Sequence, residues 1–232
     1  MSRLTLVLLL LLPACAPVGD DDDSATPAPE PVTAALRALD AFGGAVEADV
    51  TIVDGAFDED TAETDDSGDV EIVLTAEAPF RVRFAASGYA PHELVGVATD
   101  DFAFTTLMGS RAAESQVYGL LDLTPDDSKG TLVVDLHADD GASPATGGSV
   151  SIDADHDAPF VFVGSGPQTG STLVPGASTF VTFPNVEPGA VTITPELPDG
   201  ACLVGPARDP EQDQRTWDVP ADTVVVIDFV CD

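Results

Sequence analysis

Three aspartates with alternate spacing are the residues best placed to do chemistry. Asp153, Asp155 and Asp157 form a D-x-D-x-D pattern in the segment SIDADHDAPF. At this spacing the carboxylates share one face of a strand or one side of a loop, and oxygen ligands of this kind suit Ca²⁺. The Gly and the distant Glu of an EF-hand loop are missing, because Pro159 and Phe160 follow. Two interpretations stay open: a Ca²⁺ site, or three solvated carboxylates in a turn, which is the commoner case.

Other groups that could do chemistry lack partners in the sequence. The acidic stretch at residues 58–66 is expected to be a solvated hairpin tip. His156 lies among the aspartates, whereas His92 and His137 stand alone. The segment PHELVG lacks the second His of H-E-x-x-H, no G-x-S-x-G elbow occurs, and the single Lys cannot serve a phosphate-binding loop. The sequence therefore predicts neither an enzyme nor a cofactor, apart from the Ca²⁺ alternative.

The charge balance restricts the partners. The 232 residues include 41 Asp and Glu but only 8 Lys and Arg, for a formal net charge of −33. Nucleic acids and anionic lipid surfaces are bound through Lys and Arg, so this balance argues against both. Hydrophobic residues make up 44% of the chain, which is enough for packed cores.

The beginning of the chain carries a signal for export. An apolar run at residues 4–12 follows Arg3, and it is too short to span a membrane as a helix. The run ends in LPAC at residues 12–15, which resembles the lipobox of bacterial lipoproteins. That resemblance implies a signal peptide at residues 1–14, cleavage before Cys15 and attachment of lipid to its thiol. The alternative is an ordinary signal peptide with an incidental cysteine.

A tether is expected after Cys15. Residues 15–31 include the segment GDDDDSATPAPEP, in which like charges repel and Pro stiffens the chain. We expect a disordered, solvated spacer here, with weak cation binding by the four aspartates as the alternative. The residue after the lipobox cysteine is Ala16 and not Asp, which by resemblance to the sorting rule of enteric bacteria favours the outer membrane.

The two remaining cysteines form an even pair in an exported chain. Cys202 and Cys231 are expected to form a disulfide, because exported proteins meet oxidising conditions. Two buried free thiols or a metal pair are the alternatives, although no nearby His/Cys cluster supports a metal.

Short alternating segments indicate an all-β fold. In FRVRFAASGY, Phe80, Val82 and Phe84 are predicted to face inward, and Arg81 and Arg83 outward. Similar segments recur at short intervals, separated by turn residues, and no long amphipathic helix occurs. We expect two antiparallel, seven-stranded-type β-sandwiches of the transthyretin-like or Ig-like kind.

The expected sandwiches occupy residues 32–111 and 116–232. A short linker or helical turn is predicted between them, at residues 110–115. The first unit resembles the carboxypeptidase regulatory-like domain, a transthyretin-like sandwich, and the second resembles it more loosely. The matching residues are Thr64, Asp65, Gly68, Ser87, Gly88 and Tyr89, together with Pro188 and Gly189. The resemblance implies a fold without catalytic residues, in modules that accompany enzymes or transporters or stand alone on bacterial surfaces.

The sequence thus favours a lipid-anchored, non-enzymatic protein of the bacterial envelope or surface, with a structural, adhesion or assembly role. Its expected partners are the membrane, through Cys15, and an envelope protein or glycan, but no nucleic acid. The alternative is a binding module that recognises Ca²⁺, glycan or a protein partner through its acidic loops.

Overall fold

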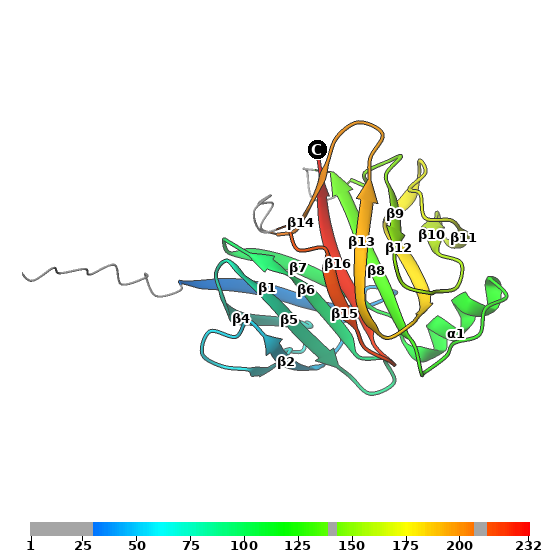
Figure 1. Ribbon diagram of the computed structural model, residues 1–232. Helices are drawn as coiled ribbons and strands as arrows, with labels where there is room; N and C mark the ends of the chain where they lie inside the picture. Colours follow the sequence, from blue (N-terminus) through cyan, green and yellow to red (C-terminus); the bar gives the residue numbers. More distant parts are fainter. Residues whose placement is uncertain (1–29, 139–142, 207–212) are drawn as a thin grey trace, which may run out of the picture.

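The chain is built mainly of β-strands (Figure 1). The computed structural model describes residues 30–138, 143–206 and 213–232. Within these ranges, sixteen strands form three sheets, and one helix, α1 (Arg111–Leu120), connects the two halves of the chain. The prediction of a mostly β fold is therefore confirmed.

The first small sheet has the strand order β4-β1-β7. Its strands are β4 (Asp69–Thr75), β1 (Pro31–Asp40) and β7 (Phe102–Met108). In β1 every second residue from Val32 to Ala38 is buried. This period of two residues places the apolar side chains on one face of the sheet. The strand β1 pairs antiparallel with β4 and parallel with β7.

A ten-stranded sheet runs through both halves of the chain. Its path is β11-β10-β12-β8-β16-β6-β5-β2-β3, and β14 pairs with the end of β16. The bounds are β11 (Gly166–Thr169), β10 (Phe160–Val163), β12 (Ala177–Val186), β8 (Gly130–Ala138), β16 (Val224–Cys231), β6 (His92–Ala98), β5 (Ala78–Ala85), β2 (Asp49–Asp54), β3 (Thr61–Glu63) and β14 (Cys202–Val204).

The second small sheet has the order β15-β13-β9. It comprises β15 (Thr216–Val219), β13 (Gly189–Glu196) and β9 (Ser149–Ile152). Each small sheet packs on one part of the ten-stranded sheet, and each contact encloses a separate hydrophobic core. We call the core beneath β4-β1-β7 the first core and the core beneath β15-β13-β9 the second core.

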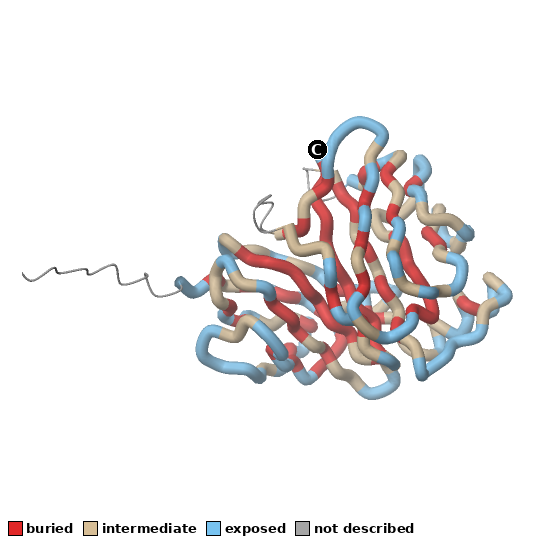
Figure 2. The backbone as a smooth tube through the Cα atoms, in the orientation of Figure 1, coloured by how far each residue is buried: buried red, intermediate tan, exposed pale blue. Residues whose placement is uncertain are grey.

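The strand β16 contributes to both cores. All eight of its residues are buried (Figure 2). Val225, Ile227 and Phe229 belong to the second core, whereas Val224 and Val226 belong to the first. Because successive side chains of a strand point to opposite faces, the two cores lie on opposite faces of the shared sheet at this strand.

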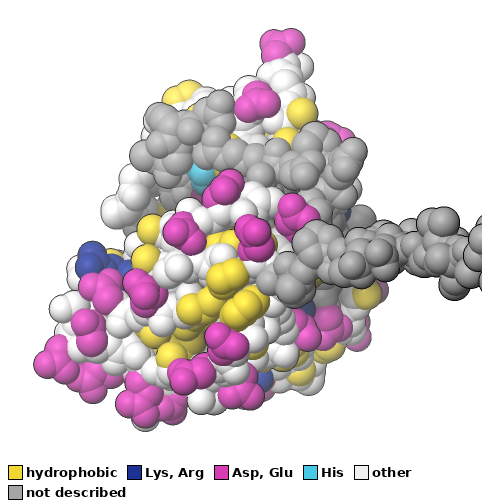
Figure 3. All heavy atoms as spheres, turned by 90° about the vertical axis from the view of Figure 1, so that its left-hand side faces the viewer, with side chains coloured by type: hydrophobic (Ala, Val, Ile, Leu, Met, Phe, Trp, Pro, Cys, Tyr) yellow, Lys and Arg dark blue, Asp and Glu magenta, His cyan; other side chains and the backbone are white. Residues whose placement is uncertain are grey.

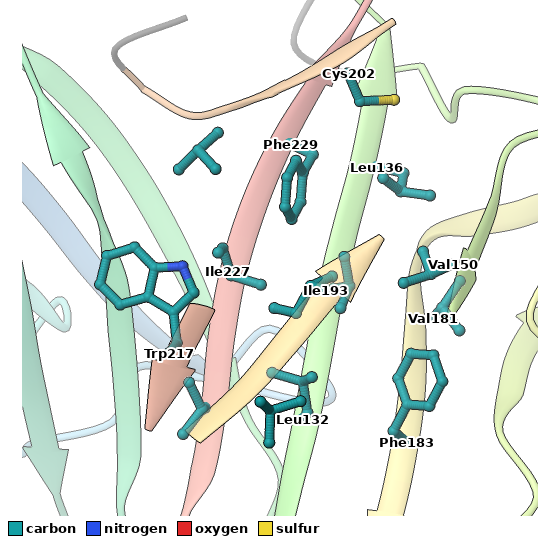
Figure 4. Packing of buried hydrophobic residues seen from close by; sticks show 14 of the residues in the cluster. Leu132, Leu136, Val150, Val181, Phe183, Ile193, Cys202, Trp217, Ile227 and Phe229 are labelled. Atoms are coloured by element: carbon teal, nitrogen blue, oxygen red, sulfur yellow. The ribbon is translucent and has the colours of Figure 1, made fainter. Parts of the chain in front are cut away.

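The second core gathers side chains from both of its sheets (Figure 4). Ile193 of β13 and Trp217 of β15 lie over Ile227 and Phe229 of β16. Trp217 is the only Trp of the chain and is 5% exposed. Its indole nitrogen donates a hydrogen bond to the backbone oxygen of Gln214 (3.0 Å), so its single polar group is satisfied.

The expectation of purely antiparallel sheets is wrong at three pairings. The strand β16 runs parallel to both β8 and β6, and β1 runs parallel to β7. Alternation in a sequence shows which residues share a face, but it does not show the direction of the neighbouring strand. The nearly continuous apolar run VVVIDFVC is typical of a strand that is buried on both faces between parallel neighbours.

The two predicted sandwiches share one sheet. The strand β16 comes from the second predicted range, yet it pairs with β6 of the first. The limits 32–111 and 116–232 stay a prediction. The predicted linker is the start of α1, where the Ser110 hydroxyl oxygen accepts a hydrogen bond from Ala113 N (3.2 Å) and caps the helix. No helix in the described part of the chain is long and apolar enough to cross a membrane.

Candidate functional site

The three alternating aspartates lie in an exposed loop after β9. Asp153 Oδ1 accepts a hydrogen bond from Thr192 N (2.7 Å), and Asp157 Oδ2 accepts one from Asn185 Nδ2 (2.7 Å). Asp155 lies exposed between them. Among the described residues, no group of three or more His, Cys, Asp and Glu side chains is arranged to hold a metal ion. The Ca²⁺ site stays a prediction.

The second acidic stretch reaches into the turn before β4. Asp65 Oδ1 accepts hydrogen bonds from Ser67 N (2.8 Å) and Asp69 N (2.9 Å). This is the usual way in which an Asp side chain closes a turn on its own backbone. In the same turn, Gly68 has a positive φ of 78°, a conformation that Gly adopts without strain. Asp65 therefore shapes the turn.

The structure joins Cys202 and Cys231 in a disulfide, which is the predicted pairing. The two residues are also direct partners in the pairing of β14 with β16. Both belong to the second core and are 4% exposed. The disulfide therefore fastens β14 to the last strand of the shared sheet. Cys15, the predicted lipidation site, lies outside the described residues.

A buried ion pair joins β8 to β16, and it corrects the view of His137 as an isolated residue. His137 Nε2 lies 2.6 Å from Asp228 Oδ1, and His137 Nδ1 lies 3.0 Å from the backbone oxygen of Ala138. Both ring nitrogens thus lie near oxygens that carry no proton to donate, which favours the protonated imidazole. The interaction with Asp228 raises the pKa of His137 to about 9, so the imidazole is protonated at neutral pH.

Asp135 completes this cluster. It is the direct partner of Asp228 in the pairing of β8 with β16. Burial raises the pKa of the Asp135 carboxyl, and the negative charge of Asp228 adds to this effect, while a hydrogen bond from Thr179 opposes it. Asp135 Oδ1 is buried without a hydrogen-bond partner among the described residues. The cluster thus combines one cation with two carboxyl groups on adjacent strands.

The sequence contains a signal for this cluster that the motif search did not use. Asp135 and Asp228 each interrupt an apolar strand, in LVVDLHA and VVVIDFV. A charged residue is rarely buried without a partner, so each interruption indicates that a partner is present.

Gly205 packs directly against Asp228, where a Cβ atom would overlap the carboxylate. Gly205 N also donates to the backbone oxygen of Asp228 (2.9 Å).

A second buried ion pair joins β5 to β6, and its Arg also contacts the second half of the chain. Arg81 of β5 was expected to face outward, yet it is 9% exposed and its Nη1 pairs with Glu93 Oε2. Its Nη2 donates a hydrogen bond to the backbone oxygen of Asp218 in β15 (2.9 Å). Phe80 and Val82 do face the first core as predicted. At Arg81 the opposite face of β5 contacts β15, which local alternation could not reveal.

His92 is buried and neutral. It is 3% exposed, at the start of β6, and its Nδ1 lies 3.0 Å from the backbone oxygen of Ala90. Since that oxygen only accepts, Nδ1 carries the proton. Burial lowers the pKa of His92 to about 4, against a smaller opposing contribution from this hydrogen bond. His92 therefore packs as a polar residue of the core.

The start of α1 is tied to the second half of the chain by charge. Arg111 Nη2 lies 2.7 Å from Asp222 Oδ1, in the turn before β16. Arg111, Lys129 and Asp222 line a cavity of about 20 Å³, which is large enough for about one water molecule. Here, as at the His137–Asp228 pair, the charged groups connect segments that are distant in sequence.

Comparisons with known proteins give only remote similarities. No protein-family model matches the chain, and no curated protein matches it. Among solved structures, a Streptococcal ancillary pilin is 13% identical over 85% of this chain and 62% of that chain, with a TM-score of 0.26. The major pilin of Streptococcus pyogenes is 10% identical over 88% of this chain and 98% of that chain, with a TM-score of 0.28.

The similarity to a third solved structure is equally remote. A variant of the shaft pilin spaA from Lactobacillus rhamnosus GG is 12% identical over 88% of this chain and 99% of that chain, with a TM-score of 0.25. The chain spans less than two thirds of the ancillary pilin. Similarities at these TM-scores do not establish a shared fold or role. The resemblances to the lipobox and to the carboxypeptidase regulatory-like domain stay predictions.

Proposed function

We propose that this chain is a lipid-anchored structural protein of a bacterial cell envelope, which holds its two sandwiches as one body above the membrane. The main support for a structural role is that the buried charged groups contact neighbouring strands of the sheet. Arg81–Glu93 and His137–Asp228 both hold strands of the shared sheet together. A buried charged side chain that is paired with a neighbouring strand stabilises the fold, and it is not available to act on a substrate.

The anchor rests on the sequence around Cys15. The short apolar run, the small residue Ala14 and the acidic spacer after the cysteine all agree with export and lipidation. Several acyl chains make attachment stable where one would be marginal. The spacer, with its like charges and prolines, suits a tether that keeps the folded part at a distance from the bilayer. The outer membrane is the proposed location.

Labelling with fatty acid tests the anchor. Cells that express the protein are supplied with labelled fatty acid, and the label is followed in the wild-type chain, in Cys15→Ser and in a double Cys202→Ser, Cys231→Ser variant. We expect label in the wild type and in the double variant and none in Cys15→Ser, which should also leave the membrane fraction. Label that persists in Cys15→Ser would refute the anchor.

The alternative role, Ca²⁺ recognition by the acidic loops, needs a separate measurement. Melting temperatures in Ca²⁺ and in NaCl at equal ionic strength distinguish a specific site from screening of the negative charge. The structural role predicts that the two salts act alike and that Asp155→Asn changes neither result. A rise that is specific to Ca²⁺ and is abolished by Asp155→Asn would support the binding role instead.

A further inference from the structure

Open sheet edges expose unpaired backbone groups, and several sheet edges among the described residues are protected. The strand β3 spans only three residues, and β11 contains Pro167. The edge of β4 is covered at Gly55, whose carbonyl accepts a hydrogen bond from Thr75 N (2.8 Å). The edge of β9 is covered at Ser171, whose carbonyl accepts one from Val150 N (3.0 Å).

The strand β7 lacks every one of these protections. It spans seven residues, FAFTTLM, without a charged residue or a Pro. It pairs with β1 along one side, and no other segment of the described chain forms a backbone hydrogen bond with its outer side. On its outward face, Ala103 and Thr105 are exposed and Leu107 is 51% exposed. An edge of this length and composition is suited to accept a further strand.

The inner face of β7 is also incompletely covered. Phe102 and Phe104 pack against the first core but are only partly buried. The ring of Phe102 stacks on Phe80, with 5.6 Å between the ring centroids. A strand added beside β7 would place alternate side chains over these two rings. Apolar residues at those positions would be buried, which favours binding in proportion to the apolar area removed from water.

The charge of the protein selects a basic partner. The formal net charge is −33, and Asp100 and Asp101 are exposed at the start of β7. Figure 3 shows Asp and Glu side chains spread over the displayed face, with few Lys and Arg side chains among them. A segment with Lys or Arg at alternate positions would be attracted to this surface, and an acidic segment would be repelled.

We propose that the free edge of β7 (Phe102–Met108) binds an extended, cationic segment of another protein, which adds to the first small sheet as a fourth strand. Its apolar residues face Phe102 and Phe104, and its basic residues lie near Asp100 and Asp101. Backbone hydrogen bonds supply affinity, and the alternating side chains supply specificity. This site is independent of the lipid anchor, because the described residues alone form it.

Two other occupants fit the edge less well. A second copy of the chain brings another −33 charges, and this repulsion opposes pairing of one β7 with another. The chain's own segment GDDDDSATPAPEP is acidic and rich in Pro. Pro lacks the N–H that a sheet pairing uses, and the aspartates would be repelled by Asp100 and Asp101.

Synthetic peptides test the proposal with the folded protein. The first peptide alternates Val and Lys over about seven residues, the length of β7. The second replaces Lys with Glu, and the third carries a central Pro. Binding is measured by fluorescence anisotropy, and amide hydrogen exchange identifies the segment that becomes protected. The edge variant is Leu107→Lys. The matched control is Val73→Lys, which makes the same kind of change at an exposed position of β4 on the same sheet.

We expect the Val-Lys peptide alone to bind and to protect the amides of residues 102–108. Leu107→Lys should weaken its binding by about ten-fold or more, because it adds a repelling charge at the edge, while Val73→Lys should change it by about two-fold or less. Equal binding of the peptide with the central Pro, or equal loss in both variants, would show general charge attraction and overturn the proposal. Self-association that Leu107→Lys abolishes, without peptide binding, would overturn it in favour of a second copy.

Discussion

Val225 and Val226 are consecutive residues of β16, yet their side chains lie in different hydrophobic cores. Val225 is fully buried in the second core, and Val226 is 8% exposed in the first. One strand therefore joins the two sandwiches through its backbone pairings with β6 and β8 and through its alternating side chains. The proposed structural role requires a connection of this kind between the two cores.

Truncation of either valine should destabilise the whole molecule. Val225→Ala and Val226→Ala each remove buried methyl groups, and we expect each to lower the free energy of unfolding by about 1–2 kcal/mol. Urea unfolding followed by circular dichroism measures the change. The control Val73→Ala, at a position that is 36% exposed, should change stability by less than about 0.5 kcal/mol. Equal effects at all three positions would argue against the burial assigned to β16.

The His137–Asp228 pair should stabilise the fold in acid and neutral solution and fail in alkali. The pKa of His137 is about 9 in the folded state, above the ordinary value of 6.5. The folded state therefore holds this proton more tightly, so the contribution is complete below about pH 6.5 and is lost as the pH rises through 9. Asp228→Asn should cost about 1–2 kcal/mol at pH 6, allowing for partial screening by solvent.

The pH dependence of that difference is the decisive observation. Unfolding free energies of wild type and Asp228→Asn are compared at several pH values between 6 and 10. The two curves should converge toward the alkaline end, because His137 becomes neutral in both proteins. A constant difference over the whole range would mean that the substitution acts through packing and not through the charge of His137.

His92 should have the opposite effect. Its pKa is about 4 in the folded state, below the ordinary value of 6.5, so the unfolded chain binds the proton more tightly. Its contribution is present above about pH 6.5 and is lost as the pH falls through 4, by at most about 1.4 kcal/mol per pH unit. In His92→Asn the side-chain amide can still donate to Ala90, but it does not titrate. This variant should lose less stability than wild type between these pH values, and identical curves would contradict the assignment.

Reduction of the disulfide should lower the stability of the molecule as a whole. A loop of 29 residues predicts a loss of about 3–4 kcal/mol in the chain-entropy account. The measurement is made in Cys15→Ser, so that only Cys202 and Cys231 remain. Alkylation followed by intact mass should detect no free thiol before reduction and two after it. Free thiols in the unreduced protein would rule out the pairing.

Local patterns predicted the faces of strands better than their partners. Phe80, Val82 and Phe84 of β5 lie in the first core as their alternation indicated. The face of a strand follows from the period of two residues, which is a local property. Hence the core residues of single strands were accessible from sequence.

The partners depend on contacts between distant segments. The guanidinium of Arg81 reaches the backbone of Asp218, and His137 reaches Asp228, in both cases across a large part of the chain. No local pattern encodes these separations. The sequence does show that Asp135 and Asp228 interrupt two apolar strands. Each interruption indicates a buried charge, but it does not show which residue pairs with it.

The central claim is that β16 makes the two sandwiches one cooperative body, and Trp217 allows a direct test. Trp217 reports on the second core, whereas Ile72, which is 4% exposed in β4, belongs to the first. Urea unfolding of Ile72→Ala is followed by Trp217 fluorescence. If the sandwiches unfold together, the Trp217 transition should lose about 2–4 kcal/mol, the full cost of the cavity in the other core. A Trp217 transition that matches wild type would show that the two sandwiches unfold separately and would contradict the account.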